Sequence, residues 1–214
     1  MSDTGWRFAN ASVTGTSHSK QDPAVCQDFS YCDAWRMGDE EVLLAIAADG
    51  AGSASHSAEG ARTVCESVRD FFCQFASGAR PFTEISRDTA RECILTCRSK
   101  LTELASKTGV QPKEFACTLL FAIVGTTSSA FFQVGDGAIV VDGIDCEPFN
   151  YIFWPDRGEY ENTTFFVTQE EALEHLQFDL VNRDIKKLAI FTDGIQRLAL
   201  DLKEHVPHAP FFSA

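Results

Sequence analysis

The stretch LLAIAADGAGSASHSAEGAR, residues 43–62, decides the fold. It begins as a continuous apolar run, which is typical of a strand covered on both faces. The run ends in Asp49-Gly50, and small or polar residues then lead into a helix predicted over 56–77. A carboxylate at the end of a rigid strand is held in place, as metal coordination and catalysis both require. The glycine beside it allows a close approach of the backbone, so its carbonyl oxygen can also serve as a ligand.

The order of the other predicted elements indicates an α+β fold in one domain, residues 1–214. A second helix is predicted over 84–107, with Gly109 as its C-terminal cap. From residue 116 onward, apolar strands are separated by polar turns, which favours neighbouring antiparallel hairpins. The predicted strands are 5–15, 28–35, 41–50, 116–125, 128–135, 138–143, 150–154 and 186–194, with a short polar helix near 169–176.

The composition argues against several classes of function. With 31 acidic and 18 basic side chains the net charge is -13, and such a surface repels nucleic acid and anionic lipid. An acidic domain holds an anionic substrate most simply through bound cations. The N-terminus shows no signal segment, and no apolar run approaches the ~18 residues of a membrane span. We therefore expect a soluble, cytoplasmic monomer without nucleic-acid or membrane partners.

The eight cysteines predict neither a nucleophile nor a zinc site. No pair forms Cys-x-x-Cys, and Cys93 and Cys97 have no histidine nearby to complete a metal site. None has an arginine six positions downstream, as in the active-site loop of cysteine-dependent phosphatases. We expect eight reduced thiols, several of them acting as small hydrophobic side chains.

Asp-Gly pairs follow apolar runs at residues 49, 136, 142 and 193. Because Asp-Gly suits the positive φ angles of tight turns, an ordinary turn is the simplest interpretation of any one pair. Asp142 fits this interpretation, since it closes AIVVDG in a region of hairpins. Asp49 and Asp193 differ, because AIAADGAG and AIFTDGIQ each run from a strand through Asp-Gly into a helix. A phosphate-binding loop is not indicated, since Ser55 stands where a dinucleotide fingerprint needs glycine and no P-loop lysine follows.

Five motifs, in family order, resemble the protein phosphatase 2C family of metal-dependent Ser/Thr phosphatases, particularly its compact bacterial members. GTSHSKQDPAVCQDFS is similar to the N-terminal metal motif, and AADGAGSASHSAEGA to the central Asp-Gly motif. FACTLLFAIV and FFQVGDGAIVV resemble the strand pair leading to the Gly-Asp motif, and GEYENTTFFVT and AIFTDGIQRLAL resemble later motifs. The resemblance covers nearly the whole chain. It implies an antiparallel β-sandwich flanked by α-helices on both faces, in a four-layer αββα arrangement.

The resemblance also implies the chemistry of the site. In such enzymes, a hydroxide bridging two Mg²⁺ or Mn²⁺ ions attacks the phosphorus of phosphoserine or phosphothreonine in protein substrates. Asp49 is then expected to bridge both ions and to be the central catalytic residue. Asp28 and the Gly50 carbonyl bind one ion, Asp193 binds the other, and Asp136 belongs to a third, weaker metal site.

The sequence departs from the family pattern in three places. Many relatives hold phosphate with an arginine before the first aspartate; this chain offers His18 or Lys20, and we favour His18, with a solvated loop histidine as the alternative. Ala51 and Gly52 stand where eukaryotic relatives have a histidine suspected of protonating the leaving group. A metal-bound water or His56 would substitute, although a helix N-terminal residue is the simpler interpretation of His56. The chain stops at HVPHAPFFSA, so we expect the C-terminal part of the fold, with the last acidic metal ligand, to be missing.

Three functions remain open. The leading hypothesis is a Mg²⁺- or Mn²⁺-dependent protein Ser/Thr phosphatase. A second is a regulatory or binding domain that has the fold without turnover; the missing last carboxylate favours it, and the retained Asp28, Asp49 and Asp193 oppose it. A third is a metal-dependent hydrolase of small phosphoesters.

Overall fold

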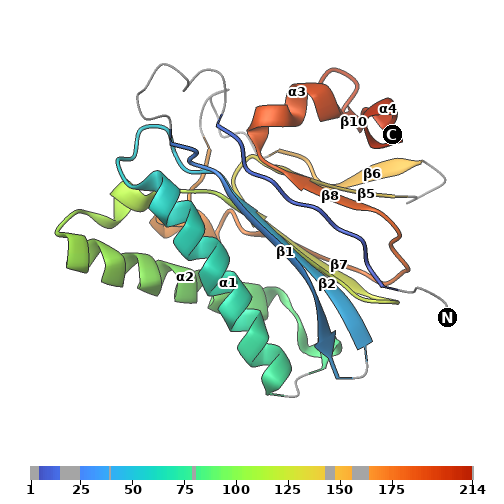
Figure 1. The fold of residues 1–214 in the computed structure, drawn as a ribbon, viewed down its shortest axis with the longest axis horizontal. Coiled ribbons are helices and arrows are strands. Elements are labelled where there is room, and N and C mark those ends of the chain that lie inside the picture. The colour runs from blue at the N-terminus through green and yellow to red at the C-terminus, as the bar shows by residue number, and fades with distance from the viewer. Residues whose placement is uncertain are drawn as a thin grey trace.

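The computed structural model describes residues 5–14, 25–38, 40–78, 81–142, 148–155 and 164–213 of the chain. Two antiparallel sheets lie against each other. Two long helices cover the outer face of the larger sheet, and short helices lie beyond the smaller one (Figure 1). The predicted α+β class and the four-layer αββα arrangement are therefore confirmed.

The larger sheet has the strand order β1-β2-β3-β4-β7, with every neighbouring pair antiparallel. Strands β2, β3 and β4 are buried along nearly their whole length, because helices cover one face and the smaller sheet covers the other. This double cover explains the continuous apolar run of β2. The strands are β1 (Phe29–Met37), β2 (Glu40–Ala48), β3 (Leu119–Val124), β4 (Ser129–Val134) and β7 (Gln177–Val181).

The smaller sheet has the strand order β6-β5-β8. Its strands are β5 (Ala138–Asp142), β6 (Phe149–Phe153) and β8 (Leu188–Phe191), and a two-residue pair follows, β9 (Leu200–Asp201) with β10 (Val206–Pro207). Because β4 belongs to the larger sheet and β5 to the smaller one, the chain crosses between the sheets at residues 135–137.

Helices α1 (Ser57–Ser77) and α2 (Arg87–Thr108) form the outer layer on the larger sheet. Ser86 begins α2 in a capping box with Thr89, and Gly109 follows it with a left-handed φ of 73°. The remaining helices are single turns. They are the 3₁₀ turns η1 (Phe82–Glu84), η2 (Pro112–Phe115), η3 (Glu170–Leu173) and η4 (Asp193–Ile195), and the α-helical turns α3 (Gln196–Ala199) and α4 (Ala209–Phe212).

Three hydrophobic clusters fill the spaces between the layers. In the first, between the long helices and the larger sheet, Phe72 of α1 stacks on Phe121 at a ring-centroid distance of 4.4 Å, and Phe121 stacks on Phe132 at 4.3 Å. The second cluster joins the two sheets and contains Leu43 and Ile139. The third lies between the smaller sheet and the region of α3 and α4. Alternate residues of β2 enter the first and second clusters, so this strand has no polar face.

Several predicted elements need correction. Residues 5–14, within the predicted strand 5–15, form no strand. The chain does not make a hairpin between β4 and β5, because it changes sheet there. The helix predicted near 169–176 is only the 3₁₀ turn η3, and β7 after it was not predicted, because QFDLV has a weak apolar pattern. The helices that cover the smaller sheet, whose length was not predicted, are single turns.

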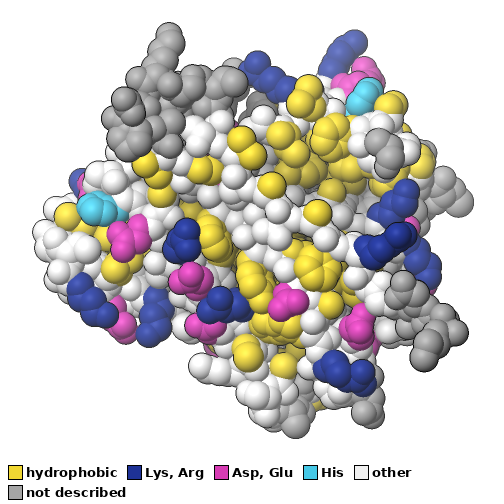
Figure 2. Space-filling model, in the orientation of Figure 1, with side chains coloured by type: hydrophobic (Ala, Val, Ile, Leu, Met, Phe, Trp, Pro, Cys, Tyr) yellow, Lys and Arg dark blue, Asp and Glu magenta, His cyan; other side chains and the backbone are white. Residues whose placement is uncertain are grey.

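Apolar side chains are exposed over α3 and α4, where Figure 2 shows them gathered on the surface. They include Ile195, Leu198 and Phe211. Within the ranges that the structure describes, no helix combines the length and apolar character needed to cross a membrane.

Several of the small residues after Asp49 are required by close packing. A Cβ on Gly60 would lie 2.1 Å from the carbonyl oxygen of Phe115, so α1 is in direct backbone contact with η2. Ser57 and Ala61 are buried at the same end of α1. Close packing of the backbone therefore accounts for part of the small side chains in this stretch.

Replacing Gly60 with alanine tests this contact. Alanine raises intrinsic helix propensity by about 1 kcal/mol, yet we expect Gly60→Ala to lower the free energy of unfolding by about 1–3 kcal/mol through overpacking. Urea denaturation measures the change. Ser99→Ala, at an exposed position inside α2, is the control and should change stability by no more than about 0.5 kcal/mol. A Gly60→Ala protein as stable as the wild type would contradict the packing argument.

Candidate functional site

A cavity of about 540 Å³ opens where β2 and β8 end and where the chain crosses from β4 to β5. Four of the predicted site residues line it, namely Asp49, Gly50, Asp136 and Asp193. The other lining residues are Ala51, Gly52, Thr118, Thr164, Phe166, Gln196 and Arg197. The fold thus brings three of the four Asp-Gly pairs to one place and leaves Asp142 outside it.

The carboxyl group of Asp49 interacts with the other three aspartates predicted to bind metal. Its pKa is raised to about 8, first because the group is buried and then because of the charges of Asp28 and Asp193. A hydrogen bond with Asp28 and the charge of Asp136 raise it further. Each of the other three aspartates predicted to bind metal therefore raises the pKa of Asp49.

Backbone hydrogen bonds from the start of β3 hold Asp49 in place. The Thr118 N–H donates to the Asp49 carbonyl at 2.8 Å, and the Asp49 N–H donates to Thr118 Oγ1 at 3.0 Å. The Ala51 N–H donates to the Ala116 carbonyl at 2.9 Å. Because the chain is fixed at Asp49 itself and again just after it, the position of the carboxylate is set by the sheet.

Gly50 allows the segment that carries Asp28 to approach the same strand end. The Gly50 N–H donates to the Gln27 carbonyl at 3.2 Å, and Gln27 Nε2 donates to Ser57 Oγ at 2.8 Å. A Cβ on residue 50 would lie 2.7 Å from the Gln27 oxygen and 2.8 Å from the Ser57 backbone. Only glycine permits this approach, which places Asp28, the residue after Gln27, beside Asp49.

Asp136 lies on the crossover between the sheets, and the alternative of an ordinary hairpin turn does not apply to it. Gly135 before it has a φ of +113°, and a Cβ there would lie 2.6 Å from Thr118 Cγ2. Buried Gln196 of α3 donates a hydrogen bond from Nε2 to the Asp136 carbonyl. Thr118 and Gln196 therefore hold the crossover from two sides.

Asp193 begins η4 directly after β8, and η4 continues into α3 as the sequence predicted. Its side chain is exposed. Asp193 therefore lies on the open side of the cavity, while Asp49 is the more buried of the two.

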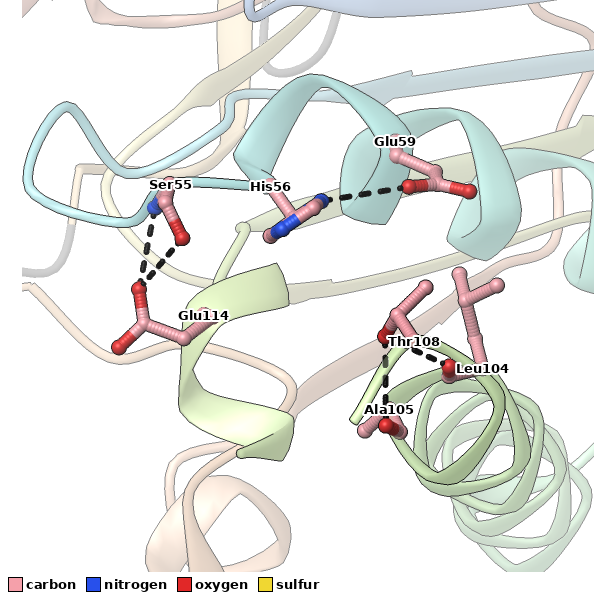
Figure 3. A network of polar contacts seen from close by, with 7 residues as sticks. All are labelled: Ser55, His56, Glu59, Leu104, Ala105, Thr108 and Glu114. Atoms are coloured by element: carbon pink, nitrogen blue, oxygen red, sulfur yellow. Dashed lines mark hydrogen bonds and ion pairs between the residues drawn. The ribbon is translucent and has the colours of Figure 1, made fainter. Parts of the chain in front are cut away.

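The loop before α1 is held by η2 (Figure 3). Glu114 Oε2 accepts hydrogen bonds from the Ser55 N–H at 3.2 Å and from Ser55 Oγ at 2.8 Å, and these bonds lower the pKa of Glu114. His56 Nδ1 lies 3.5 Å from Glu59 Oε2, and its ring lies 5.1 Å from that of Phe115. His56 does not line the cavity, which supports its interpretation as a helix N-terminal residue.

Asp142 is part of a structural connection. Its Oδ1 accepts hydrogen bonds from the N–H groups of Lys186 and Lys187, each at 2.9 Å, and its own N–H donates to the Lys187 carbonyl at 3.1 Å. These bonds join the end of β5 to the chain entering β8. The cavity lies at the other end of β5, so Asp142 belongs to the sheet and not to the site.

Sequence reasoning identified some site residues and missed others. His18 and Lys20 lie outside the described residues, so the predicted phosphate contact stays a prediction. Sequence analysis assigned no role to Thr118, Gln196 or Arg197. The available signal for Thr118 was its place as the one polar residue in FACTLLFAIV. Gln196 and Arg197 had no signal beyond their place just after an Asp-Gly pair.

The donor set suits a hard divalent cation. Carboxylates and a backbone carbonyl are the oxygen ligands that Mg²⁺ and Mn²⁺ prefer, and a bound cation would stabilise the ionised form of Asp49, which burial and the neighbouring carboxylates disfavour. In the parts of the chain that the structure describes, no three His, Cys, Asp or Glu side chains stand at the spacing of a complete ligand set. Cations held here would therefore keep waters in their coordination shell, as Mg²⁺ commonly does.

Comparisons with known proteins agree with the fold and the motifs. The family model for protein phosphatase 2C matches residues 14–214. Serine/threonine-protein phosphatase 3 of Escherichia coli (strain K12) is 35% identical over 212 residues, which cover 97% of this chain and 81% of the relative. A crystal structure of a bacterial serine phosphatase has a TM-score of 0.64 at 15% identity, covering 91% of this chain and 80% of that one. The S. agalactiae serine/threonine phosphatase has a TM-score of 0.61 at 20% identity, covering 89% and 80%.

The fold is that of the bacterial serine and serine/threonine phosphatases named above, and four of the predicted site residues line one cavity in it. The chain belongs to the protein phosphatase 2C family, because the family model covers nearly all of it. The predicted family and the predicted enzyme class, a protein serine/threonine phosphatase, are confirmed by this match and by the E. coli relative.

Thr118→Val tests the connection between Asp49 and β3. Valine keeps the shape but removes the acceptor of the Asp49 N–H, so we expect the free energy of unfolding to fall by about 1–3 kcal/mol. Thr118→Ser keeps the hydroxyl and should lose less. Urea denaturation of both variants measures the difference, and equal stability of the valine variant and the wild type would show that this hydrogen bond contributes nothing.

Proposed function

We propose that this protein hydrolyses phosphoserine and phosphothreonine in protein substrates, with Mg²⁺ or Mn²⁺ bound at the carboxylate cavity. The observation that carries the proposal is the convergence of Asp28, Asp136 and Asp193 on Asp49 at the ends of rigid strands. Membership of the protein phosphatase 2C family supports the substrate class. Within the described residues, seven free cysteines include none that lines the cavity, so the site is not built around a thiol.

The proposed ligands follow the geometry of the strand ends. Asp49 would bridge two ions, because it is the carboxylate on which the others act. Asp28 and the Gly50 carbonyl would hold one ion, since Gly50 brings these two segments together. Asp193 would hold the other, and Asp136 on the crossover would hold a third ion. Two such ions, when bound, would supply positive charge to the phosphoryl oxygens and would activate water for attack on phosphorus.

Other residues of the protein would position the proposed metal ligands and the substrate phosphate. Thr118 fixes the Asp49 backbone, and Gln196 fixes that of Asp136. Small Ala51 and Gly52 leave the cavity open beside the carboxylates. His18 is proposed as a phosphate contact on the strength of the motif in which it stands.

The two rival functions make different predictions. The spacing of the described carboxylates, which form no complete ligand set, is the observation that favours a domain without turnover. A hydrolase of small phosphoesters would act on nucleotides or p-nitrophenyl phosphate faster than on phosphopeptides. Kinetics with phosphopeptides, nucleotides and p-nitrophenyl phosphate, each with and without Mn²⁺, separates all three functions.

Metal removal tests the mechanism. We expect phosphopeptide hydrolysis to require added Mn²⁺ or Mg²⁺ and to disappear in excess EDTA, because the carboxylates that line the cavity would otherwise repel a phosphoryl group. Elemental analysis confirms that the metal has been removed. Turnover that persists in metal-free protein would exclude the proposed mechanism.

Asp49→Asn and Asp142→Asn form a matched pair within the Asp-Gly set. Asp49→Asn should lower kcat at least about 10³-fold, since a neutral amide cannot bridge two cations. Asp142→Asn should keep kcat within about twofold, because its carboxylate only joins β5 to β8. Circular dichroism checks that both variants are folded. Equal rates for the two variants at saturating Mn²⁺ would refute the assignment of Asp49.

A further inference from the structure

The cavity has one basic side chain among its described lining residues. Asp49, Asp136 and Asp193 line it together with Arg197, and no lysine or second arginine does. A phosphoryl group is a dianion and must enter a cavity whose own charge is negative. A guanidinium at the edge of this cavity is therefore in the place where it can offset the repulsion.

Arg197 is held by a rigid part of the fold. Gln196, the residue before it, is buried and donates to the Asp136 carbonyl, so the first turn of α3 is attached to the sheet crossover. Ala199 and Leu200 after it are buried in the cluster on the smaller sheet. These contacts fix the backbone on both sides of Arg197, while its side chain remains exposed at the cavity.

The guanidinium is available for a ligand. In the described part of the chain, Arg197 has no hydrogen bond or ion pair with another residue. Two other arginines do have protein partners: Arg87 donates to the Leu176 carbonyl at 2.8 Å, and Arg69 pairs with Asp70 at 2.7 Å. Arg197 is thus a positioned cation that lines the cavity with three carboxylates and has no partner among the described residues.

We propose that Arg197 is a substrate-binding residue that contacts the phosphoryl group of the phosphoserine or phosphothreonine side chain. This inference rests on the proposed phosphatase function. The planar guanidinium donates two parallel hydrogen bonds to phosphoryl oxygens, a geometry that lysine cannot reproduce. Because Arg197 lines the same cavity as Asp49, Asp136 and Asp193, a phosphoryl group bound there would be within reach of both the guanidinium and the proposed ions.

Kinetics of Arg197→Ala and Arg197→Lys test this role, with Arg91→Ala on α2 as the control. Arg91 is exposed on the helical layer of the larger sheet and away from the cavity. We expect KM for a phosphopeptide to rise about tenfold in Arg197→Ala, with kcat changed less, since the loss of one charge-assisted contact weakens ground-state binding. Arg197→Lys should recover part of the affinity, and Arg91→Ala should match the wild type.

Titration calorimetry with inorganic phosphate, in buffer containing Mg²⁺, provides a readout that does not depend on turnover. The dissociation constant should rise about tenfold in Arg197→Ala and remain unchanged in Arg91→Ala. If the wild type showed no phosphatase activity but this difference remained, the proposed function would fail and the assignment of Arg197 would stand. Phosphate affinity and KM equal in the two alanine variants, or a wild type that binds no phosphate, would overturn the assignment.

Discussion

The two hydrogen bonds between Asp49 and Thr118 are the interaction on which the site depends. They join the end of β2, which carries the central carboxylate, to the start of β3. Thr118 also contacts Gly135 through its methyl group, so the same residue limits the path of the crossover to Asp136. Buried Thr118 thus helps to fix the relative positions of Asp49 and Asp136, which are far apart in sequence. The buried Thr118 side chain accepts one of these hydrogen bonds and its backbone N–H donates the other, so the backbone at Asp49 has few alternative positions and the site has a defined geometry.

The same arrangement opposes the stability of the folded chain. Partial burial of Asp49, and after it the charges of the neighbouring carboxylates, disfavour its ionised form, and the raised pKa of Asp49 expresses this cost. The surrounding structure offsets it with apolar packing, including the stacked rings of Phe72, Phe121 and Phe132 against α1. Such a balance is expected at a functional site, where charges that destabilise the protein alone are matched to a ligand of opposite charge. Bound cations and Arg197 would together offset the negative charge of the site and of a bound phosphate.

Much of the carboxylate set could be predicted from the sequence, because each member lies in a local pattern. Asp49 and Asp193 each end an apolar strand and precede a helix, and Asp28 and Asp136 stand in recognisable motifs. The residues that position them had weaker patterns. Thr118 is hydrogen-bonded to Asp49, at the end of a strand that is distant in sequence. Such a long-range hydrogen bond produces no periodic pattern in the sequence, so it could not be predicted. Gln196 and Arg197 acquire their roles only because α3 lies against the crossover.

The sequence by itself determined the α+β class, the two long helices, the buried central strands and the Asp-Gly strand ends, because periodicity and turn chemistry are local properties. Tertiary structure alone decided which strands pair and where the chain changes sheet. It placed β4 and β5 in different sheets. It also made a strand of QFDLV, because hydrogen bonding to β4 stabilises a segment whose apolar pattern is too weak to predict a strand. It also separated Asp136 from Asp142, two Asp-Gly pairs at opposite ends of β5. Their sequences are alike, but only one end of that strand meets the ends of β2 and β8.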